Sequence, residues 1–348
     1  MKKLSLLILI IISFKFSYSQ ELISKNRGDL RLLFYNVENL FDTKNDSIKN
    51  DDDFTPSGIR NWTYSKYKAK LTKIAKVICA VGEWQFPEIV GLAEIENKKV
   101  VADLVYNSPL KRARYRYIHK ESPDKRGIDV ALLYNSKRLK LLENKFINVG
   151  SSKLNLITRD ILYVKFKSLG DENIYLFVNH WPSRYGGKEK SKSKRKHVAK
   201  ILKNKLDSIF LINQNSNIIV MGDFNDYFHN ESISKILDVK LLNDSIKYST
   251  MYNLSYSKNT DNFYGSYKHN GSWGFLDQIF VSGGLLNKKN YLYVKDKQAK
   301  VFIKDFLLEK DKKYTGFKPY RTFKGFKYNR GFSDHLPIYI DLWRNPKK

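Results

Sequence analysis

Acidic and amide side chains follow apolar segments at several places in the sequence. Asp223 and Asn225 come after the run Ile218–Met221 and a glycine, and Glu94 follows the run Ile89–Ala93. An uncompensated charge beside such a run would be costly to bury, and a bound cation would compensate it. Mg²⁺ suits this role because it takes one or two carboxylates, keeps waters and binds substrate phosphate. The alternatives are a solvated surface glutamate and an ordinary Asp-x-Asn turn.

Two of the six histidines lie in motifs that also hold acids or amides. Asp334 and His335 directly precede one apolar run, and His180 ends another. An imidazole with a pKa of about 6.5 is the natural general base at neutral pH. Asp277 enters the otherwise apolar segment Leu276–Val281, where a buried carboxylate needs a partner, and a histidine is the obvious one. A structural histidine that caps a strand is the alternative.

Three further charged residues stand near apolar runs. Arg184 follows His180 by four positions and could lie beside a phosphate. Asp129 enters an apolar run, and Arg159 precedes another. Each of these signals is weak alone, because arginine and aspartate neighbours are commonly surface pairs that contribute little.

The apolar runs alternate with amphipathic segments, which predicts an α/β fold whose polar strand ends build a site on a rigid frame. Stretches 43–61 and 182–194, which hold proline, glycine and charged residues, are expected to be loops. The predicted strands are Leu30–Tyr35, Ile89–Ala93, Ile128–Tyr134, Ile161–Phe166, Ile174–Val178, Ile218–Met221, Leu276–Val281 and Leu336–Leu342. The predicted helices are Tyr64–Val81, Val100–Tyr106, Arg195–Leu211 and Ile233–Leu237.

The 348 residues carry a formal charge of +28, which favours polyanions such as nucleic acid or anionic lipid. Lysine drift in an A/T-rich genome is the alternative origin of this charge. Cys79 is the single cysteine, so the chain has no internal disulfide and no cysteine-built metal site.

Residues 1–19 resemble an export signal. Lys2 and Lys3 precede the apolar run Leu4–Ile12, and Ser17 to Ser19 offers a cleavage site before Gln20. The run is too short to span a bilayer, which needs roughly 20 apolar residues. We therefore expect residues 20–348 to form one domain that is secreted or periplasmic, without a stable membrane anchor.

The order of these motifs resembles that of the endonuclease/exonuclease/phosphatase superfamily, which includes the pancreatic-type deoxyribonucleases. Each motif has many chance matches, whereas all of them in this order form a specific signal, closest to the exported bacterial members. The matching residues are Tyr35–Asp42, Glu94, Arg126–Ala131, Thr158, Arg159, Asn179–Ser183, Gly222–Asn225, Gly271–Trp273, Leu276, Asp277 and Ser333–His335.

This resemblance implies a four-layer α/β sandwich, in which two packed mixed β-sheets are flanked by helices. It also implies a divalent cation, Mg²⁺ or Mn²⁺, with Ca²⁺ as a further option. Glu94 would be the principal metal carboxylate, with Asn36 and Asp334 near the ion, partly through water.

The resemblance further implies catalytic roles. His335, oriented by Asp277, would activate the attacking water, and Asp223 and Asn225 would align that water with the scissile phosphate. These roles fit phosphodiester hydrolysis, in which a cation and fixed donors supply most of the electrostatics.

The resemblance also implies a role for His180, supported by Asp129. This histidine would contact the phosphate or help to protonate the leaving oxygen. Arg159 and Arg184 are expected to bind phosphate oxygens.

Three functions remain open at this level. The first is an exported nuclease acting on DNA or RNA, with no obligate protein partner. The second is a phosphatase or phospholipid phosphodiesterase of the same fold; a sphingomyelinase-like enzyme would be expected to show an exposed apolar hairpin, for which the sequence offers no clear candidate. The third is a catalytically inactive binding module, which would have lost Glu94, His180, His335 or Asp277, and none of them is lost.

Overall fold

The computed structural model describes residues 27–345 except 169, 185–186, 243–244 and 257–264. The expected export signal at residues 1–19 therefore lies outside the described residues. In the described part of the chain, no helix combines the length and the apolar character that a bilayer crossing requires.

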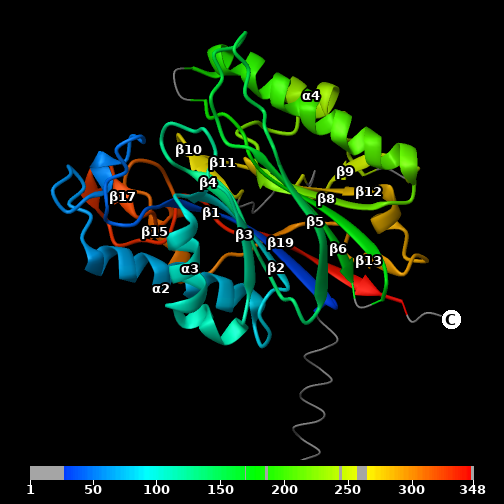
Figure 1. Cartoon of the computed structure of the whole chain (residues 1–348), viewed down its shortest axis with the longest axis horizontal. Coiled ribbons are helices and arrows are strands. Elements are labelled where there is room, and N and C mark those ends of the chain that lie inside the picture. Colours follow the sequence, from blue (N-terminus) through cyan, green and yellow to red (C-terminus); the bar gives the residue numbers. More distant parts are fainter. Residues whose placement is uncertain (1–26, 169, 185–186, 243–244, 257–264, 346–348) are drawn as a thin grey trace, which may run out of the picture.

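Two β-sheets form the centre of the molecule (Figure 1). Each contains one parallel pair, β1 with β2 in the first sheet and β7 with β8 in the second. The first sheet has the order β13 (Leu292–Val294), β19 (Ile338–Arg344), β1 (Leu30–Leu40), β2 (Ile89–Ile95), β4 (Asp129–Tyr134) and β3 (Arg116–His119), and β14 (Lys300–Val301) also pairs with β19. The second has the order β5 (Leu139–Ile147), β6 (Ile161–Ser168), β7 (Asn173–His180), β8 (Asn217–Asp223), β12 (Asp277–Ser282) and β9 (Met251–Asn253).

Three apolar clusters join four layers. One cluster lies between the two sheets and includes Phe34 of β1 and Met221 of β8. A second packs α2 (Tyr64–Gly82) and α3 (Lys98–Tyr106) onto the first sheet, and a third packs α4 (Lys188–Ile212) onto the second. The helices accordingly flank the paired sheets on both sides (Figure 1). This arrangement confirms the predicted four-layer α/β sandwich.

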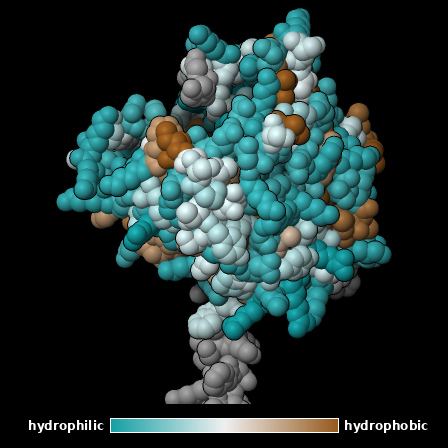
Figure 2. All heavy atoms as spheres, turned by 60° about the vertical axis from the view of Figure 1, so that its left-hand side comes forward, coloured by the Kyte–Doolittle hydropathy of each residue, from teal (hydrophilic) through white to brown (hydrophobic). Residues whose placement is uncertain are grey.

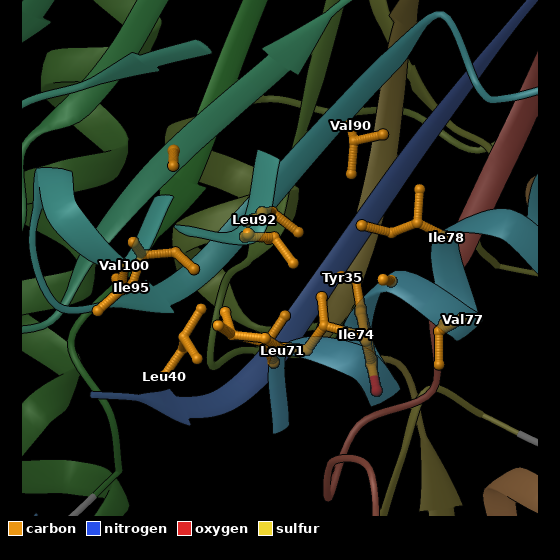
Figure 3. Packing of buried hydrophobic residues seen from close by; sticks show 14 of the residues in the cluster. Tyr35, Leu40, Leu71, Ile74, Val77, Ile78, Val90, Leu92, Ile95 and Val100 are labelled. Carbon is orange, nitrogen blue, oxygen red and sulfur yellow. The ribbon is translucent and has the colours of Figure 1, made fainter. Parts of the chain in front are cut away.

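Strand β1 shows why the apolar runs are nearly continuous. Its successive side chains point to opposite faces, so Leu33 and Tyr35 belong to the helix-facing cluster while Leu32 and Phe34 belong to the inter-sheet cluster. A strand covered on both faces has no polar face, unlike a strand exposed on one side. Figure 3 shows Leu71 and Ile74 of α2 packed beside Tyr35 of β1.

The smaller elements lie in the connections between these layers. Near the sheet edges, short hairpins and single helical turns cover the ends of the strands. They are η1 (Asp52–Phe54), η2 (Pro109–Ala113), η3 (Ser232–Ile236), β10 (Tyr267–His269), β11 (Ser272–Gly274), η4 (Gly283–Leu286), η5 (Asp305–Leu307), β15 (Leu308–Lys310), β16 (Phe317–Pro319), β17 (Phe323–Lys324) and β18 (Lys327–Tyr328).

The structure corrects two features of the predicted element list. Helix α4 begins at Lys188, inside the stretch expected to be a loop, and its first turns are held by Arg195, whose Nε lies 2.8 Å from Asp226. Strands β3 and β5 were not predicted because both lie at sheet edges and carry charged, partly exposed residues. Charged residues at a sheet edge disfavour pairing with a strand of another molecule. They also interrupt the apolar pattern from which a strand is predicted. The visible face in Figure 2 is correspondingly hydrophilic, with apolar residues in small patches.

Gly222 allows β8 to approach β7 closely just before the predicted catalytic segment. A Cβ atom at this position would lie 2.4 Å from the carbonyl oxygen of Asn179. We therefore expect Gly222→Ala to lower the free energy of unfolding by about 1–3 kcal/mol, the usual cost of overpacking. Urea unfolding measures this change. Gly150→Ala is the matched control, because its nearest neighbour is the side chain of the exposed-loop residue Asn148; an equal loss in both variants would contradict the packing explanation.

Candidate active site

The sheet pairings bring three predicted residues side by side at one edge of the second sheet. Because β7 and β8 run parallel, His180 is in register with Asp223 at the end of both strands. Strand β12 runs antiparallel to β8 and starts at Asp277, which pairs with Asp223. The local strand pairing therefore aligns His180, Asp223 and Asp277 in one row.

Asp223 occupies the centre of the site. Its Oδ2 lies 3.1 Å from Nδ2 of Asn36, 3.7 Å from Nε2 of His180 and 3.9 Å from Nε2 of His335. Burial, followed by the nearby carboxylate of Asp277, raises the pKa of Asp223 to about 6, although the His335 imidazole opposes this shift. One buried carboxylate therefore faces an amide from the first sheet and two imidazoles.

His335 and Asp277 form a short hydrogen bond. Nδ1 of His335 lies 2.6 Å from Oδ2 of Asp277, and both side chains are buried. Because the carboxylate accepts the proton on Nδ1, the neutral imidazole keeps its lone pair on Nε2. Burial alone would lower the pKa of His335, but the Asp277 carboxylate raises it well above the ordinary value. The Tyr267 ring packs against the imidazole at 4.8 Å between centroids.

His180 has the opposite electrostatic environment. Its side chain is buried, and its Nε2 lies 4.0 Å from Oε1 of Glu94. Burial and the positive charges of Arg159 and Arg126 lower the pKa of His180 well below the ordinary value. The two imidazoles beside Asp223 thus have pKa values shifted in opposite directions.

Glu94 lies at an irregularity of β2, where the pairing of this strand with β4 is interrupted. Its φ is +65°, and the register of β2 with β4 shifts between Ala93 and Ile95. Oε2 of Glu94 accepts a hydrogen bond from the backbone N–H of Asn39 at 2.8 Å. Left-handed backbone at a non-glycine residue is uncommon and concentrates at functional sites.

Asn36 links the two sheets. Its Nδ2 donates to Asp223 and lies 3.4 Å from Oε1 of Glu94, while its Oδ1 accepts from the backbone N–H of Glu38. Asn36 therefore presents its amide nitrogen to the carboxylates. To bind a metal ion through Oδ1, Asn36 would have to give up the hydrogen bond that this oxygen accepts from the backbone N–H of Glu38.

The donor chemistry of this edge suits a hard divalent cation. Among the described residues, the group whose ligand atoms all lie within 4.8 Å of one another is Asp223, Asp277 and His335, and the buried Oδ1 of Asp277 has no hydrogen-bond partner. This group differs from the predicted set of Glu94, Asn36 and Asp334. Carboxylate oxygens dominate both sets, as Mg²⁺, Mn²⁺ and Ca²⁺ prefer.

Asp334 lies on the His335 side of the site. Its Oδ1 is 4.0 Å from Nε2 of His335, and its Oδ2 accepts a hydrogen bond from Arg321 at 3.0 Å. Arg321 also donates to the buried Glu38 at 3.1 Å. Among the described residues, Asp334 has no hydrogen bond or ion pair with Glu94 or Asn36, and its role near the ion, partly through water, stays a prediction.

Sequence reasoning gave no role to Glu38, Arg321 and Lys70. Lys70 is buried in α2, and its Nζ donates to Thr322 and to the carbonyl of Phe332. Burial lowers the pKa of Lys70 to about 8, and it raises that of Glu38 to about 6. A single lysine on an amphipathic helix carries no signal that it points inward, so Lys70 could not be identified from the sequence, whereas Glu38 lies within the matching segment Tyr35–Asp42 without a role assigned to it.

Asp129 requires a correction. Its carboxylate accepts the backbone N–H of Ser122 at 3.0 Å and lies 3.8 Å from Nε2 of His119. Within the described part of the chain it has no hydrogen bond or ion pair with His180. The reason is the unpredicted strand β3, which pairs with β4 and places His119 beside it. Burial raises the pKa of Asp129 to about 7 and lowers that of His119 to about 4.

Arg159 also differs from its predicted phosphate-binding role. The side chain is buried, and its guanidinium donates to Asp124 at 2.9 Å and to the backbone carbonyls of His180 and Trp181. Three of its donors are therefore committed within the protein. Arg159 holds the segment that carries His180.

We expect Arg159→Met to lower the free energy of unfolding by about 3 kcal/mol, because it leaves the buried Asp124 carboxylate without its closest partner. Thermal and urea unfolding test this value. Arg112→Met, which removes a charge from an exposed position, serves as the control. A loss for Arg159→Met as small as the control's would show that this ion pair does not stabilise the fold.

Arg184 anchors the loop that follows β8. It donates to the carbonyl of Asn225 at 2.7 Å and to the side chains of Asp226 and Asn230, and its guanidinium stacks on Tyr227. Asn225 itself has a φ of +51° and donates to the carbonyl of Trp181 at 3.1 Å. The structure brings Arg184 to the Asn225 loop, with its donors directed to protein oxygens.

The sequence profile of the Endonuclease/Exonuclease/phosphatase family matches residues 31–344. None of the curated proteins compared with the chain matches it. Solved structures share its fold. The human nocturnin catalytic domain with bound sulfate is 16% identical, with 91% of this chain and 94% of that chain covered and a TM-score of 0.54.

Two further structures are similar over comparable lengths. The mannosyl-6-phosphatase of Bacteroides thetaiotaomicron is 16% identical, with 90% and 99% of the two chains covered and a TM-score of 0.55. D. rerio TDP2 complexed with a single-strand DNA product is 14% identical, with 90% and 98% covered and a TM-score of 0.51. The match over residues 31–344 shows that this chain belongs to the Endonuclease/Exonuclease/phosphatase family, whose members are hydrolases of phosphoester bonds.

Proposed function

We propose that this protein is an exported, metal-dependent phosphodiesterase that cleaves nucleic acid. The observation that carries the proposal is the central carboxylate of Asp223, which stands between His180 and His335. Two imidazoles beside one oxygen of a buried carboxylate can both act on a phosphate bound there, one of them on the attacking water.

His335 acts as the general base in this proposal. The Asp277 carboxylate fixes the proton on Nδ1 and strengthens the imidazole as a base, so Nε2 takes the proton of the attacking water. The new bond joins the water oxygen to phosphorus as the bond from phosphorus to the leaving oxygen breaks. Asp223 and Asn225 orient the water and the phosphate. His180, whose low pKa keeps it neutral, contacts the phosphate, and the leaving oxygen takes up a proton from solvent.

Enzymes of this family typically depend on a divalent metal, and the oxygen-rich edge fits one. Glu94 would hold the cation as principal carboxylate, with Asn36 and Asp334 contributing partly through water. Bound there, a divalent cation supplies charge stabilisation for the phosphoryl oxygens. Asp277, whose Oδ1 has no hydrogen-bond partner, and Asp223 would offer the same ion further carboxylate oxygens.

Nucleic acid is the substrate class that the charge supports best. The formal charge of +28 attracts polyanions, and electrostatic contacts with phosphates dominate nucleic-acid binding. Nocturnin and TDP2 are structural neighbours, and the TDP2 structure holds a single-strand DNA product. Lipid phosphodiesters and sugar phosphates are the competing substrates, since the same fold occurs in a mannosyl-6-phosphatase.

A substrate panel decides between these classes. The purified mature chain is incubated with Mg²⁺ and plasmid DNA, single-stranded RNA, a phospholipid or a generic phosphodiester. We expect hydrolysis of a nucleic acid that weakens steeply with salt. If only the phospholipid or the small ester is hydrolysed, and salt does not affect the rate, the nuclease proposal is wrong. The protein would then be a phosphatase or a phospholipid phosphodiesterase of the same fold. Secretion is tested separately, by mass spectrometry of the N-terminus after export, which should begin at Gln20.

A further inference from the structure

A positively charged cavity lies next to the proposed reaction centre. It has a volume of about 760 Å³ and is bounded by Arg126, Thr158, Arg159, Lys190 and Lys194 together with less polar residues. These residues come from the loop before β4, the segment before β6 and the first turns of α4. Three distant parts of the sequence therefore contribute basic or hydroxyl groups to one cavity.

The charges of this cavity are only partly neutralised within the protein. Asp124 also lines it and pairs with Arg159 at 2.9 Å and with Arg126 at 3.4 Å. Lys190 and Lys194 have no ion pair within the part of the chain that the structure describes. The cavity thus carries a net positive charge that an anion can compensate, and its two lysines are exposed enough to move toward one.

Thr158 provides a second, independent indication of a ligand. The residue is 3% exposed, it lines the cavity, and its hydroxyl has no hydrogen-bond partner. Burying a hydroxyl without a hydrogen bond costs free energy, on the order of 1–3 kcal/mol. A phosphate oxygen in the cavity would accept a hydrogen bond from this hydroxyl, and the positive charges of the two lysines would compensate the phosphate charge.

Arg159 connects the cavity to the catalytic strand. The same guanidinium that forms part of the cavity wall donates to the backbone carbonyls of His180 and Trp181. A ligand in the cavity therefore lies one side chain away from the segment that presents His180. Pro182 and Ser183, which follow His180 closely in the chain, also line the cavity.

Resting on the proposed function, we propose that this cavity is a subsite for a second phosphate of the substrate, covalently connected to the phosphate that is cleaved. The preferred substrates therefore carry at least two phosphates. A nucleic-acid strand and a nucleoside bisphosphate both meet this requirement. The subsite supplies affinity for the extended substrate and takes no part in the bond-breaking step.

Direct binding separates this proposal from the catalytic one. In the His335→Ala background, in which cleavage is expected to be slow, calorimetry measures Kd for thymidylyl-thymidine, for its trinucleotide and for thymidine 3′,5′-bisphosphate. We expect the ligands with two phosphates to bind about tenfold more tightly than the ligand with one. Lys190→Gln combined with Lys194→Gln should abolish this advantage and leave the Kd of thymidylyl-thymidine unchanged. For a single strand, the slope of log K against log salt should fall by about 0.7 for each lysine removed.

The matched control carries Lys200→Gln and Lys205→Gln, which remove the same charge from the same helix away from the cavity. It should retain the full advantage of the second phosphate. Tighter binding of the trinucleotide alone assigns the subsite to a strand, and tighter binding of the bisphosphate alone assigns it to a nucleotide. The subsite proposal would be wrong if both double variants lost the advantage of the second phosphate equally, or if neither lost it. If no phosphoester is hydrolysed but the binding pattern persists, the proposed reaction fails while the subsite stands.

Discussion

Replacing His335 by alanine should lower the kcat of phosphodiester hydrolysis by about 10²–10⁴-fold, the usual contribution of a positioned base. The imidazole is the group that Asp277 orients at 2.6 Å, and no other described side chain takes its place on that carboxylate. KM should change much less, because the attacking water and not the substrate loses its partner. Steady-state kinetics on the nucleic acid identified in the substrate panel measures both constants.

Two controls separate lost chemistry from lost structure. His335→Gln keeps a side chain able to donate to Asp277, so it should fold like the parent and remain as inactive as the alanine variant. His269→Ala removes an exposed histidine and should retain full activity. A folded His335→Ala protein that turns over at the parental rate would remove His335 as the base.

Replacing Glu94 by glutamine should lower kcat/KM by about 10²-fold or more, because in the proposed mechanism this carboxylate would hold the cation that stabilises charge in the reaction. The substitution keeps an oxygen that can accept from the backbone N–H of Asn39, so the strand end should keep its conformation. Chelation with EDTA should abolish the parental activity, and added Mg²⁺ or Mn²⁺ should restore it. The variant should require a higher metal concentration for its residual activity.

Glu96→Gln is the matched control for this carboxylate. Glu96 lies two positions away and accepts the backbone N–H of Asp42 at 2.6 Å. Burial raises the pKa of Glu96 to about 8, so the side chain is mostly protonated at pH 7 and the substitution removes little charge. It should leave the metal requirement unchanged. Full parental activity in EDTA, or equal losses in both variants, would contradict a metal role for Glu94.

The strands that carry the site could be predicted because they are buried on both faces. β1, β2, β7 and β8 are continuous apolar runs, and their polar ends mark the edge where the site lies. The family resemblance then supplied the pairing of His335 with Asp277, which the structure contains. Local sequence alone could not join Asn36 to Asp223, because their contact spans 187 positions.

The parts that could not be predicted depend on edge strands and on buried charge. β3 reads as polar because it lies at an edge, so the contact between His119 and Asp129 was not visible and His180 was given the wrong partner. Arg159 and Arg184 match a phosphate ligand in residue type, but the carbonyls they bind belong to loops whose course no local pattern determines. Residue type alone does not distinguish an arginine that binds substrate from one that holds the backbone.

The position of β1 in its sheet has a consequence for how the protein is synthesised. The first strand of the described chain lies between β2 and β19, and β19 is the last strand. During translation, β1 keeps one side open until β19 emerges, and His335 emerges only just before that strand. A ribosome-bound or truncated chain therefore lacks both a closed first sheet and the base that Asp277 orients. The proposed hydrolysis therefore requires that translation has passed β19.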